Sequence, residues 1–501
     1  MPRVALAPSR WAVGSLVLLV VVGLLSLAQP LHGDQAFFFV IARQLQHGDV
    51  LYGDIVDLKQ PAIFLFYLLA GNLFGWTAFG AHLLELLWWL AFAIVLSVTV
   101  APRFRHPVVR AVVPAGVGIA YYLGVTFYDL GQVEALVGFP LFVAWWFARE
   151  PRPDDRRGQA ALALAGFAAA VVVLFKYPYV LVVVALWVVA LVRARRRGAS
   201  TRMAAHTVGW IAAGAAVPAV VFLAYFGARG QLGNVWDAWV VMSRESRELW
   251  PPTRHDLVHS TTWFLRRYLL LFVLAALPTY QWLCRRTALS GELLLWMVVG
   301  GLAVLPQHLW EYLWFVLMVP LALLAALGAD SLLTDYRVVE RRRALAVGCV
   351  VALLGLPLWR TTLTNVSRYV HNDLALTVDG RRAITEAVLS DTSAINEQVT
   401  KLKEAGDVSD GIYVFGDPRY HLQTAQPYPV RYHGWAFEFY SPQRWRDLVG
   451  ELAATRPAYI FIDSDWADLV RERSPELTAL LEQQYDIWSV ETNGTWYYSR
   501  S

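Results

Sequence analysis

The chain has 501 residues, of which 57% are hydrophobic and only 16% are charged, and its mean hydropathy is +0.43. Soluble proteins usually carry charge on about a quarter of their residues, so most of this chain is expected to face membrane lipids. The formal net charge is only +4, and the arginines form short clusters between apolar runs. This pattern argues against a nucleic-acid partner and indicates a multi-pass membrane protein.

Apolar runs long enough to form membrane-spanning helices follow one another up to residue 359. A hydrocarbon core of roughly 30 Å is crossed by about 20 helical residues. On this criterion the sequence predicts eleven spans, at residues 11–29, 79–101, 111–128, 135–148, 160–175, 178–192, 207–226, 262–283, 291–305, 312–328 and 344–359. The first run has no convincing cleavage site after it, so it is predicted to be a retained helix and not a signal peptide.

The arginine clusters predict the orientation in the cell membrane. They occur near residues 3–10, 103–110, 149–157, 193–197, 285–286 and 337–343. Because Lys and Arg collect in short cytoplasmic loops, eleven spans place the clusters and the N-terminus in the cytoplasm and the C-terminus outside. A crossing by the apolar segment 61–76 would invert this pattern. That segment is therefore predicted to be an interfacial or re-entrant helix that begins at Pro61 and ends at Gly75.

From about residue 360 the chain becomes polar. Strands are predicted at residues 412–415, 459–462, 487–490 and 495–498, and helices at residues 442–454 and 475–484. Asn493-Gly494 between the last two strands is a strong signal for a two-residue hairpin turn. The sequence thus predicts a transmembrane domain over residues 1–359 and a small extracytoplasmic α/β domain over residues 360–501.

The first external segment carries an acidic residue soon after the first span. It reads His32-Gly33-Asp34-Gln35 and continues through residues 36–45 with apolar side chains at helical spacing. This spacing predicts an amphipathic helix on the membrane surface that ends at Gly48. Asp34 stands at the start of this helix, where two roles remain open: a structural N-cap and a functional carboxylate.

The same segment continues as Leu51-Tyr52-Gly53-Asp54, reaches Lys59-Gln60-Pro61 and closes on Leu73-Phe74-Gly75. Over residues 30–76 the order is an Asp after the first span, a helix, a Gly-x-x-x-Tyr stretch, a Lys-x-Pro element and an apolar segment ending in Phe-Gly. This order resembles the GT-C glycosyltransferases of the protein O-mannosyltransferase and lipid A aminoarabinose transferase type. The rest of the chain agrees with them in topology and at scattered positions.

The resemblance implies an all-α, GT-C-like membrane bundle that moves a sugar from a polyprenyl-phosphate donor to a hydroxyl of a lipid, glycan or protein acceptor at the extracytoplasmic face. Asp34 would be the general base, and Lys59 would lie near the donor phosphate. A positioned carboxylate contributes about 10²- to 10⁴-fold to such a proton transfer. Cations stabilise the charge that develops on the leaving phosphate. Some relatives bind a divalent metal ion near these carboxylates and others do not, so the resemblance leaves a metal open.

Further ionisable and polar side chains are predicted at the external ends of the spans. Asp129 and Glu134 lie in the second external loop, Lys176 lies in the next external turn, and His308 and Tyr312 precede a Pro-containing span. Singly, such residues more often just end a span at the water interface. Their convergence on one face favours a site.

His82 marks a departure from the resemblance. Relatives often have an Arg near the start of the second span, whereas this chain has His82, with Glu85 three residues further on the same helical face. His82 therefore either replaces the Arg as a donor-phosphate contact or pairs with Glu85.

Two other functions compete with glycosyl transfer. A transporter or flippase of envelope lipids or glycans also needs many spans and buried ions, but transporters tend to show paired repeats and interrupted helices, and no repeat is visible here. The third reading is a non-catalytic assembly protein whose external domain binds a partner.

Overall fold

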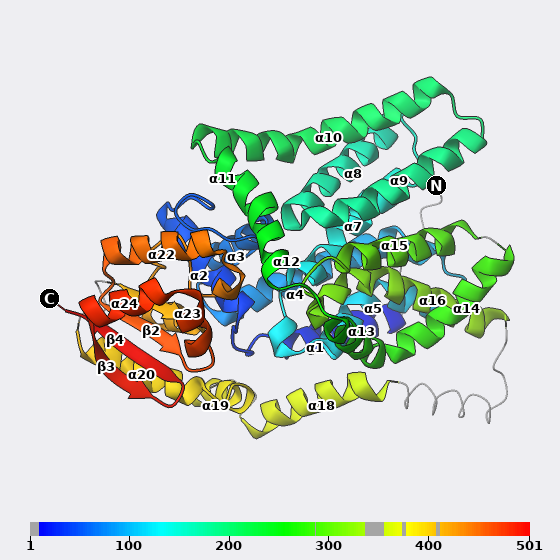
Figure 1. Cartoon of the computed structure of the whole chain (residues 1–501). Coiled ribbons are helices and arrows are strands. Elements are labelled where there is room, and N and C mark those ends of the chain that lie inside the picture. The colour runs from blue at the N-terminus through cyan, green and yellow to red at the C-terminus, as the bar shows by residue number, and fades with distance from the viewer. Residues whose placement is uncertain (1–9, 286, 336–354, 373–376, 407–410, 501) are drawn as a thin grey trace. The chain divides into compact units, whose positions relative to one another are not determined.

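A computed structural model of the chain describes residues 10–285, 287–335, 355–372, 377–406 and 411–500. These residues form mostly helices, with one small sheet (Figure 1). They fall into two compact units, each of which is discontinuous in sequence. Unit 1 comprises the described parts of residues 1–28, 82–222 and 252–371, and unit 2 those of residues 29–81, 223–251 and 372–501.

Unit 1 consists of helices. Those that lie wholly or mainly in it are α1 (Arg10–Leu24), α4 (Ala78–Val98), η1 (Ala101–Arg103), α5 (Pro107–Gly124), η2 (Phe127–Asp129), α6 (Val133–Leu136), α7 (Gly138–Ala148), α8 (Arg156–Phe175), η3 (Tyr177–Tyr179), α9 (Val180–Arg196), α10 (Thr201–Ala228), α13 (Arg254–Arg267), α14 (Leu269–Arg285), α15 (Ala288–Val304), η5 (Glu311–Leu317), α16 (Met318–Asp335) and α18 (Leu356–His371).

Among the described residues, 6 helical segments are long and apolar enough to cross a membrane, and the pair α13–α14, bent by 84°, adds a seventh if it counts as one span. Shorter apolar helices cover residues 10–24, 61–74, 133–148 and 288–304. Every predicted span up to residue 328 thus coincides with an apolar helix, and the chain is a polytopic membrane protein. Apart from residues 355–359, the predicted span 344–359 and the cluster 337–343 lie outside the described residues. The total of eleven spans therefore stays a prediction.

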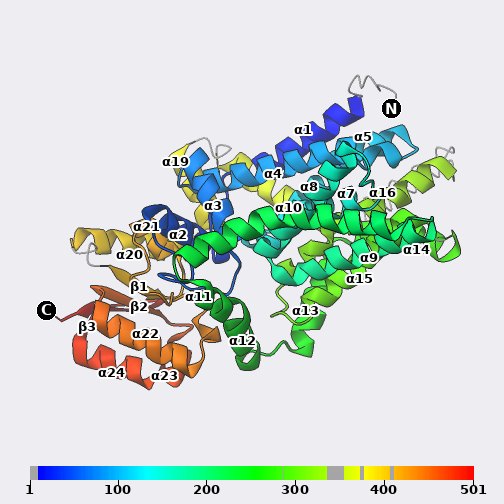
Figure 2. The ribbon, with the colours of Figure 1, turned by 90° about the horizontal axis from the view of Figure 1, so that it is seen from above.

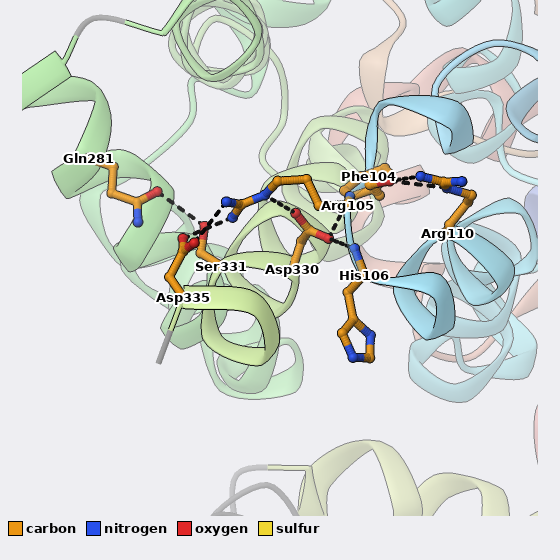
Figure 3. Close-up of polar contacts among 8 residues, drawn as sticks. All are labelled: Phe104, Arg105, His106, Arg110, Gln281, Asp330, Ser331 and Asp335. Carbon is orange, nitrogen blue, oxygen red and sulfur yellow. Dashed lines mark hydrogen bonds and ion pairs between the residues drawn. The ribbon is translucent and has the colours of Figure 1, made fainter. Parts of the chain in front are cut away.

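A polar network ties the start of α5 to α16 and α14 (Figure 3). The backbone N–H groups of Arg105 and His106 both donate to Asp330 Oδ1, at 3.0 and 2.7 Å. The Arg105 guanidinium contacts Asp330 Oδ2 at 3.2 Å and both carboxylate oxygens of Asp335. Ser331 donates to Gln281 of α14 at 3.3 Å. Asp330 thus satisfies N–H groups that the start of a helix leaves without intrahelical partners.

Unit 2 begins with two helices from the first external segment. They are α2 (Asp34–His47) and α3 (Pro61–Phe74), which pack against each other. The predicted ends are confirmed, since Gly48 closes α2 in the left-handed conformation, Pro61 opens α3 and Gly75 closes it. Burial on α2 differs from the prediction, because it is not confined to one apolar face. Residues 35–42 are all buried, so α2 is enclosed by protein along most of its length.

The C-terminal residues of unit 2 form an α/β/α sandwich. Its strands are β1 (Ile412–Phe415), β2 (Tyr459–Asp463), β3 (Tyr485–Glu491) and β4 (Gly494–Ser499), in the order β1-β2-β4-β3. Its helices are α19 (Val378–Val388), α20 (Thr392–Glu404), α21 (Arg419–Thr424), η8 (Phe437–Phe439), α22 (Pro442–Thr455), α23 (Ala467–Arg473) and α24 (Pro475–Gln484). The segment 223–251 adds α11 (Leu232–Trp236), the π-helix η4 (Asp237–Met242) and α12 (Ser243–Leu249) to the same unit.

Alternate residues of β1 and β2 point to opposite faces of this sheet and bury both of them. Ile412 and Val414 pack with α20 and α21, whereas Tyr413 and Phe415 pack with α22 and α24. Figure 2 shows α20 on one side of the sheet and α22 to α24 on the other. All four predicted strands and both predicted helices are present. The hairpin turn is Thr492-Asn493, one residue earlier than predicted, because Gly494 already pairs with Asp463.

Candidate functional site

Asp34 is the first residue of α2, and its carboxylate is not a helix cap. The capping residue is Gly33, with no side-chain cap hydrogen bond, so the N-cap reading of Asp34 is wrong. Asp34 Oδ1 instead accepts a hydrogen bond from Trp435 Nε1 at 2.9 Å. The carboxylate is also 15% exposed, which leaves it accessible at the surface of unit 2.

Lys59 lies beside Asp34, as two residues of one predicted site should. Lys59 Nζ is 3.5 Å from Asp34 Oδ1. The same ammonium lies 5.2 Å from the ring of Phe38 and 5.8 Å from that of Phe37, within the range of cation–π attraction. Lys59 is therefore held by three residues of α2.

The loop between α21 and η8 brings Trp435 to Asp34. Gly434 packs directly on β1, where a Cβ atom would lie 1.8 Å from the Val414 carbonyl oxygen, so glycine is required there. Gly416 N–H donates to the Gly434 carbonyl at 2.9 Å. Three residues before Gly434, the Arg431 carbonyl accepts a hydrogen bond from Val56 N–H. This bond joins the loop to the segment that precedes Lys59. The site is thus assembled from residues about 400 positions apart.

Asp57 and His433 form a buried pair behind Lys59. Asp57 Oδ1 accepts from Lys59 N–H at 2.7 Å, and Asp57 Oδ2 is 3.3 Å from His433 Nε2. Burial raises the pKa of Asp57, but the charge of Lys59 and the contact with His433 outweigh it, so the pKa is below its usual value. Burial lowers the pKa of His433. Because His433 Nδ1 accepts from Trp435 N–H, the proton of the neutral ring is assigned to Nε2, facing Asp57.

Glu438 in η8 is a second carboxyl group in electrostatic contact with Asp34 and Lys59. Its Oε2 is buried and has no hydrogen-bond partner among the described residues. Burial raises the pKa of Glu438 to about 7, and the charge of Asp34 acts in the same direction. With a pKa of about 7, this carboxyl can both release and accept a proton near neutral pH, as acids and bases in catalytic sites do.

In unit 1 Glu134 and Lys176 form a direct ion pair. Glu134 is buried, with 1% of its side chain exposed, and Lys176 keeps 23% exposed. Tyr179 donates to the same carboxylate at 3.5 Å. The segment with Glu134 and the turn after α8 are therefore brought together, and that both lie at an external face stays a prediction.

Asp129 lies near the segment that carries His308 and Tyr312. Thr126 Oγ1 donates to Asp129 Oδ2 at 2.5 Å. Burial raises the pKa of Asp129 to about 6; the negative charge of Glu311 adds to the rise, and the positive charge of Arg267 opposes it. Tyr312 follows Glu311 in η5, and His308 precedes η5; both are partly buried.

His82 pairs with Glu85, one of the two roles left open by the sequence. His82 Nδ1 is 3.4 Å from Glu85 Oε2, and both side chains are buried. Glu85 Oε1 also accepts from Tyr121 OH at 2.5 Å and from Gly131 N–H at 2.9 Å. His82 Nε2 is buried and has no hydrogen-bond partner within the described part of the chain.

The sequence did not single out Trp435, His433 or Glu438. They are far from residues 30–76 and belong to no motif used there. One signal was present, because residues 428–440 hold six aromatic side chains inside a polar domain: Tyr428, Tyr432, Trp435, Phe437, Phe439 and Tyr440. No group of three or more His, Cys, Asp or Glu residues in the described ranges is arranged to hold a metal ion.

The described residues thus combine an apolar helical bundle with an α/β/α unit. A crystal structure of ArnT from Cupriavidus metallidurans bound to undecaprenyl phosphate matches with a TM-score of 0.61 and 15% sequence identity, over 98% of this chain and 98% of that one. The suspected fold type, that of the lipid A aminoarabinose transferase ArnT, is thereby confirmed.

Two structures of the Archaeoglobus fulgidus oligosaccharyltransferase are also similar. One is a complex with Zn and sulfate, with a TM-score of 0.46 and 13% identity over 96% of this chain and 73% of that one. The other is tethered to an acceptor peptide, with a TM-score of 0.49 and 12% identity over 97% and 74%. No family model and no curated protein sequence matches the chain.

Proposed function

We propose that this protein is a glycosyltransferase that moves a sugar from a polyprenyl-phosphate donor to a hydroxyl of a lipid, glycan or protein acceptor at the extracytoplasmic face of the cell membrane. The observation that carries the proposal is the Asp34–Lys59 pair, at 3.5 Å, in a chain with the fold of ArnT. The structure of ArnT holds undecaprenyl phosphate, a lipid of the proposed donor class.

In the proposed reaction Asp34 takes the proton of the acceptor hydroxyl. The hydroxyl oxygen forms a bond to the anomeric carbon, and the bond from that carbon to the phosphate oxygen breaks, which inverts the anomeric centre. The polyprenyl phosphate leaves with the bonding electrons and gains negative charge. Lys59 stabilises that charge, and Trp435 orients Asp34 through its Nε1–H.

For unit 1 the proposal assigns Lys176 and His82 to further contacts with the donor phosphate. The Lys176 side chain is partly exposed although its ammonium pairs with Glu134, and the buried His82 Nε2 has no hydrogen-bond partner among the described residues. Glu134, Asp129, His308 and Tyr312 are proposed as the remaining site residues.

The experiment that tests this proposal compares envelope glycans and glycolipids by mass spectrometry in a strain with and without the protein. The strain without it is expected to lose a sugar-bearing species and to accumulate the polyprenyl-phosphate sugar. Restoring the wild-type gene should reverse both changes. Unchanged glycans together with an unchanged donor pool would contradict the proposal.

A further inference from the structure

A pocket of about 400 Å³ in unit 1 gathers four arginine side chains at the end of α9. Arg149 follows the last residue of α7, Arg152 lies in the next loop, and Arg193 and Arg197 belong to the end of α9. Glu150 is the one carboxylate among the described residues that line it. Such a volume is in the range of small-ligand sites.

A buried carboxylate holds two of these arginines in place before any ligand binds. Glu292 of α15 is 3% exposed and pairs with both Arg149 and Arg193. Arg149 is only 7% exposed, and its guanidinium lies 4.9 Å from the ring of Trp146. An ordered guanidinium loses little conformational entropy on binding, and its planar set of N–H donors matches the oxygens of a phosphate.

The charges in and around the pocket do not balance. Among the described residues, the four lining guanidinium groups are accompanied by two carboxylates, Glu150 and Glu292, and Glu150 is shared with a fifth guanidinium, that of Arg103, at 3.8 Å. The remaining wall includes Ala190 and Ala194, which leave space between the charged side chains. The pocket therefore fits a compact anion.

The pocket lies at the opposite end of α9 from Lys176. Lys176 precedes η3 and α9, whereas the pocket surrounds the last turn of α9, 17 residues later. That helix is about 25 Å long, close to the thickness of the hydrocarbon core. Along its length Leu181, Val184 and Val188 are exposed, as expected for side chains that face acyl chains. The pocket thus lies where phospholipid phosphates of the other leaflet are found.

We propose that this pocket binds the phosphate of an anionic phospholipid headgroup. Basic pockets between the cytoplasmic ends of membrane helices recognise such headgroups by their charge. The site is separate from the proposed site of sugar transfer and does not depend on it. A soluble phosphate ion has the same recognition chemistry and is the alternative that the experiment must separate.

The experiment is native mass spectrometry of the purified full chain in detergent with phosphatidylglycerol or with phosphatidylcholine of the same acyl chains. The wild type is expected to retain phosphatidylglycerol preferentially. The double variant Arg152→Gln/Arg197→Gln removes two exposed lining charges without touching the Glu292 contacts, and it should bind phosphatidylglycerol roughly tenfold to thirtyfold more weakly.

The matched control is Arg195→Gln/Arg196→Gln, which removes two exposed charges from the same helix end outside the pocket. This control should retain phosphatidylglycerol as the wild type does. Equal losses in both double variants would reduce the effect to general surface charge and overturn the site. Equal retention of the two lipids by the wild type, or displacement of phosphatidylglycerol by millimolar inorganic phosphate, would likewise overturn the lipid assignment.

Discussion

At the scale of single residues, Lys59 is expected to have two roles. Its ammonium lies beside Asp34 and near the ring of Phe38. Without a donor it balances the carboxylate. When a donor is bound, Lys59 is proposed to stabilise the negative charge that develops on the leaving phosphate. Removing Lys59 should therefore affect the use of the lipid donor more than the stability of the fold.

We expect Lys59→Ala and Lys176→Ala each to raise the donor concentration required for half-maximal transfer roughly tenfold to a hundredfold. The reason is the loss of one charge-assisted phosphate contact, worth about 1.5–3 kcal/mol. Sugar transfer is measured in membranes against donor concentration. Lys403→Ala, at an exposed lysine that donates to the Gln423 carbonyl, serves as the control. Donor dependence that matches the control in both variants would remove these lysines from the mechanism.

Glu438 predicts a dependence of stability on pH. Its folded-state pKa of about 7 is above the value of 4.5 that it has when exposed, so the folded protein holds this proton more tightly than the unfolded chain. The stabilisation of the folded protein by this bound proton is complete below pH about 4.5 and is lost as the pH rises through about 7. One pKa unit corresponds to about 1.36 kcal/mol, so the shift of roughly 2.5 units limits the loss to at most about 3.4 kcal/mol.

Glu438→Gln removes the titration and should flatten the stability profile between pH 5 and pH 8. The measurement is the apparent unfolding temperature in detergent at several pH values. Glu476→Gln, at an exposed position of α24, should keep the wild-type slope. If Glu438→Gln follows the same slope as this control, the pKa of Glu438 is not raised in the folded protein.

Local sequence was sufficient to nominate Asp34 and Lys59, because both lie within one segment of 47 residues, positions 30–76. It could not nominate Trp435 or Glu438, since their roles arise only when the loop between α21 and η8 packs on β1 through Gly434. It also left Asp34 between two roles. The position of Gly33 as the capping residue excludes the N-cap role, and no pattern in the sequence predicts the contact of Asp34 with Trp435.

At the scale of elements, the start of α5 depends on a carboxylate from α16 (Figure 3). Asp330 is buried and accepts hydrogen bonds from two backbone N–H groups, whereas Asp335 pairs with the exposed guanidinium of Arg105. Asp330→Ala should lower the free energy of unfolding by about 1–3 kcal/mol, because buried N–H groups lose their acceptor. Thermal unfolding in detergent is the measurement.

Asp335→Ala is the matched control for Asp330, since it removes a carboxylate from the same arginine at the surface. It should leave the unfolding temperature nearly unchanged, as exposed ion pairs usually do. Equal losses in the two variants would mean that the ion pair with Arg105, and not the backbone contact, stabilises this junction.

The boundaries of many elements could be read from the sequence because local chemistry sets them. Pro61 and Gly75 limit α3, and alternating apolar residues mark β1 and β2. Burial around α2 could not be read in this way, because its partners α3 and α21 come from different parts of the chain. The bend between α13 and α14 interrupts a run that the sequence presents as one apolar span.

At the scale of the whole molecule, the arginine distribution predicts a cytoplasmic N-terminus and an extracytoplasmic C-terminus, with α3 not crossing the membrane. Alkaline phosphatase fused after Ser501 should therefore be active, and a fusion near Arg105 should be inactive. The reverse pattern would overturn the topology, and with it the side of the membrane assigned to Asp34.

The measurement that tests the central claim most directly is transfer of labelled sugar from a polyprenyl-phosphate donor in membranes that contain equal amounts of folded wild type or Asp34→Asn. Asn can still accept the hydrogen bond from Trp435, and Gly33 remains the cap of α2, so the fold should be kept. As general base, Asp34 contributes about 10²- to 10⁴-fold. The account predicts that the wild type transfers label and releases polyprenyl phosphate while Asp34→Asn loses at least about a hundredfold in rate; near-normal transfer by Asp34→Asn would contradict it.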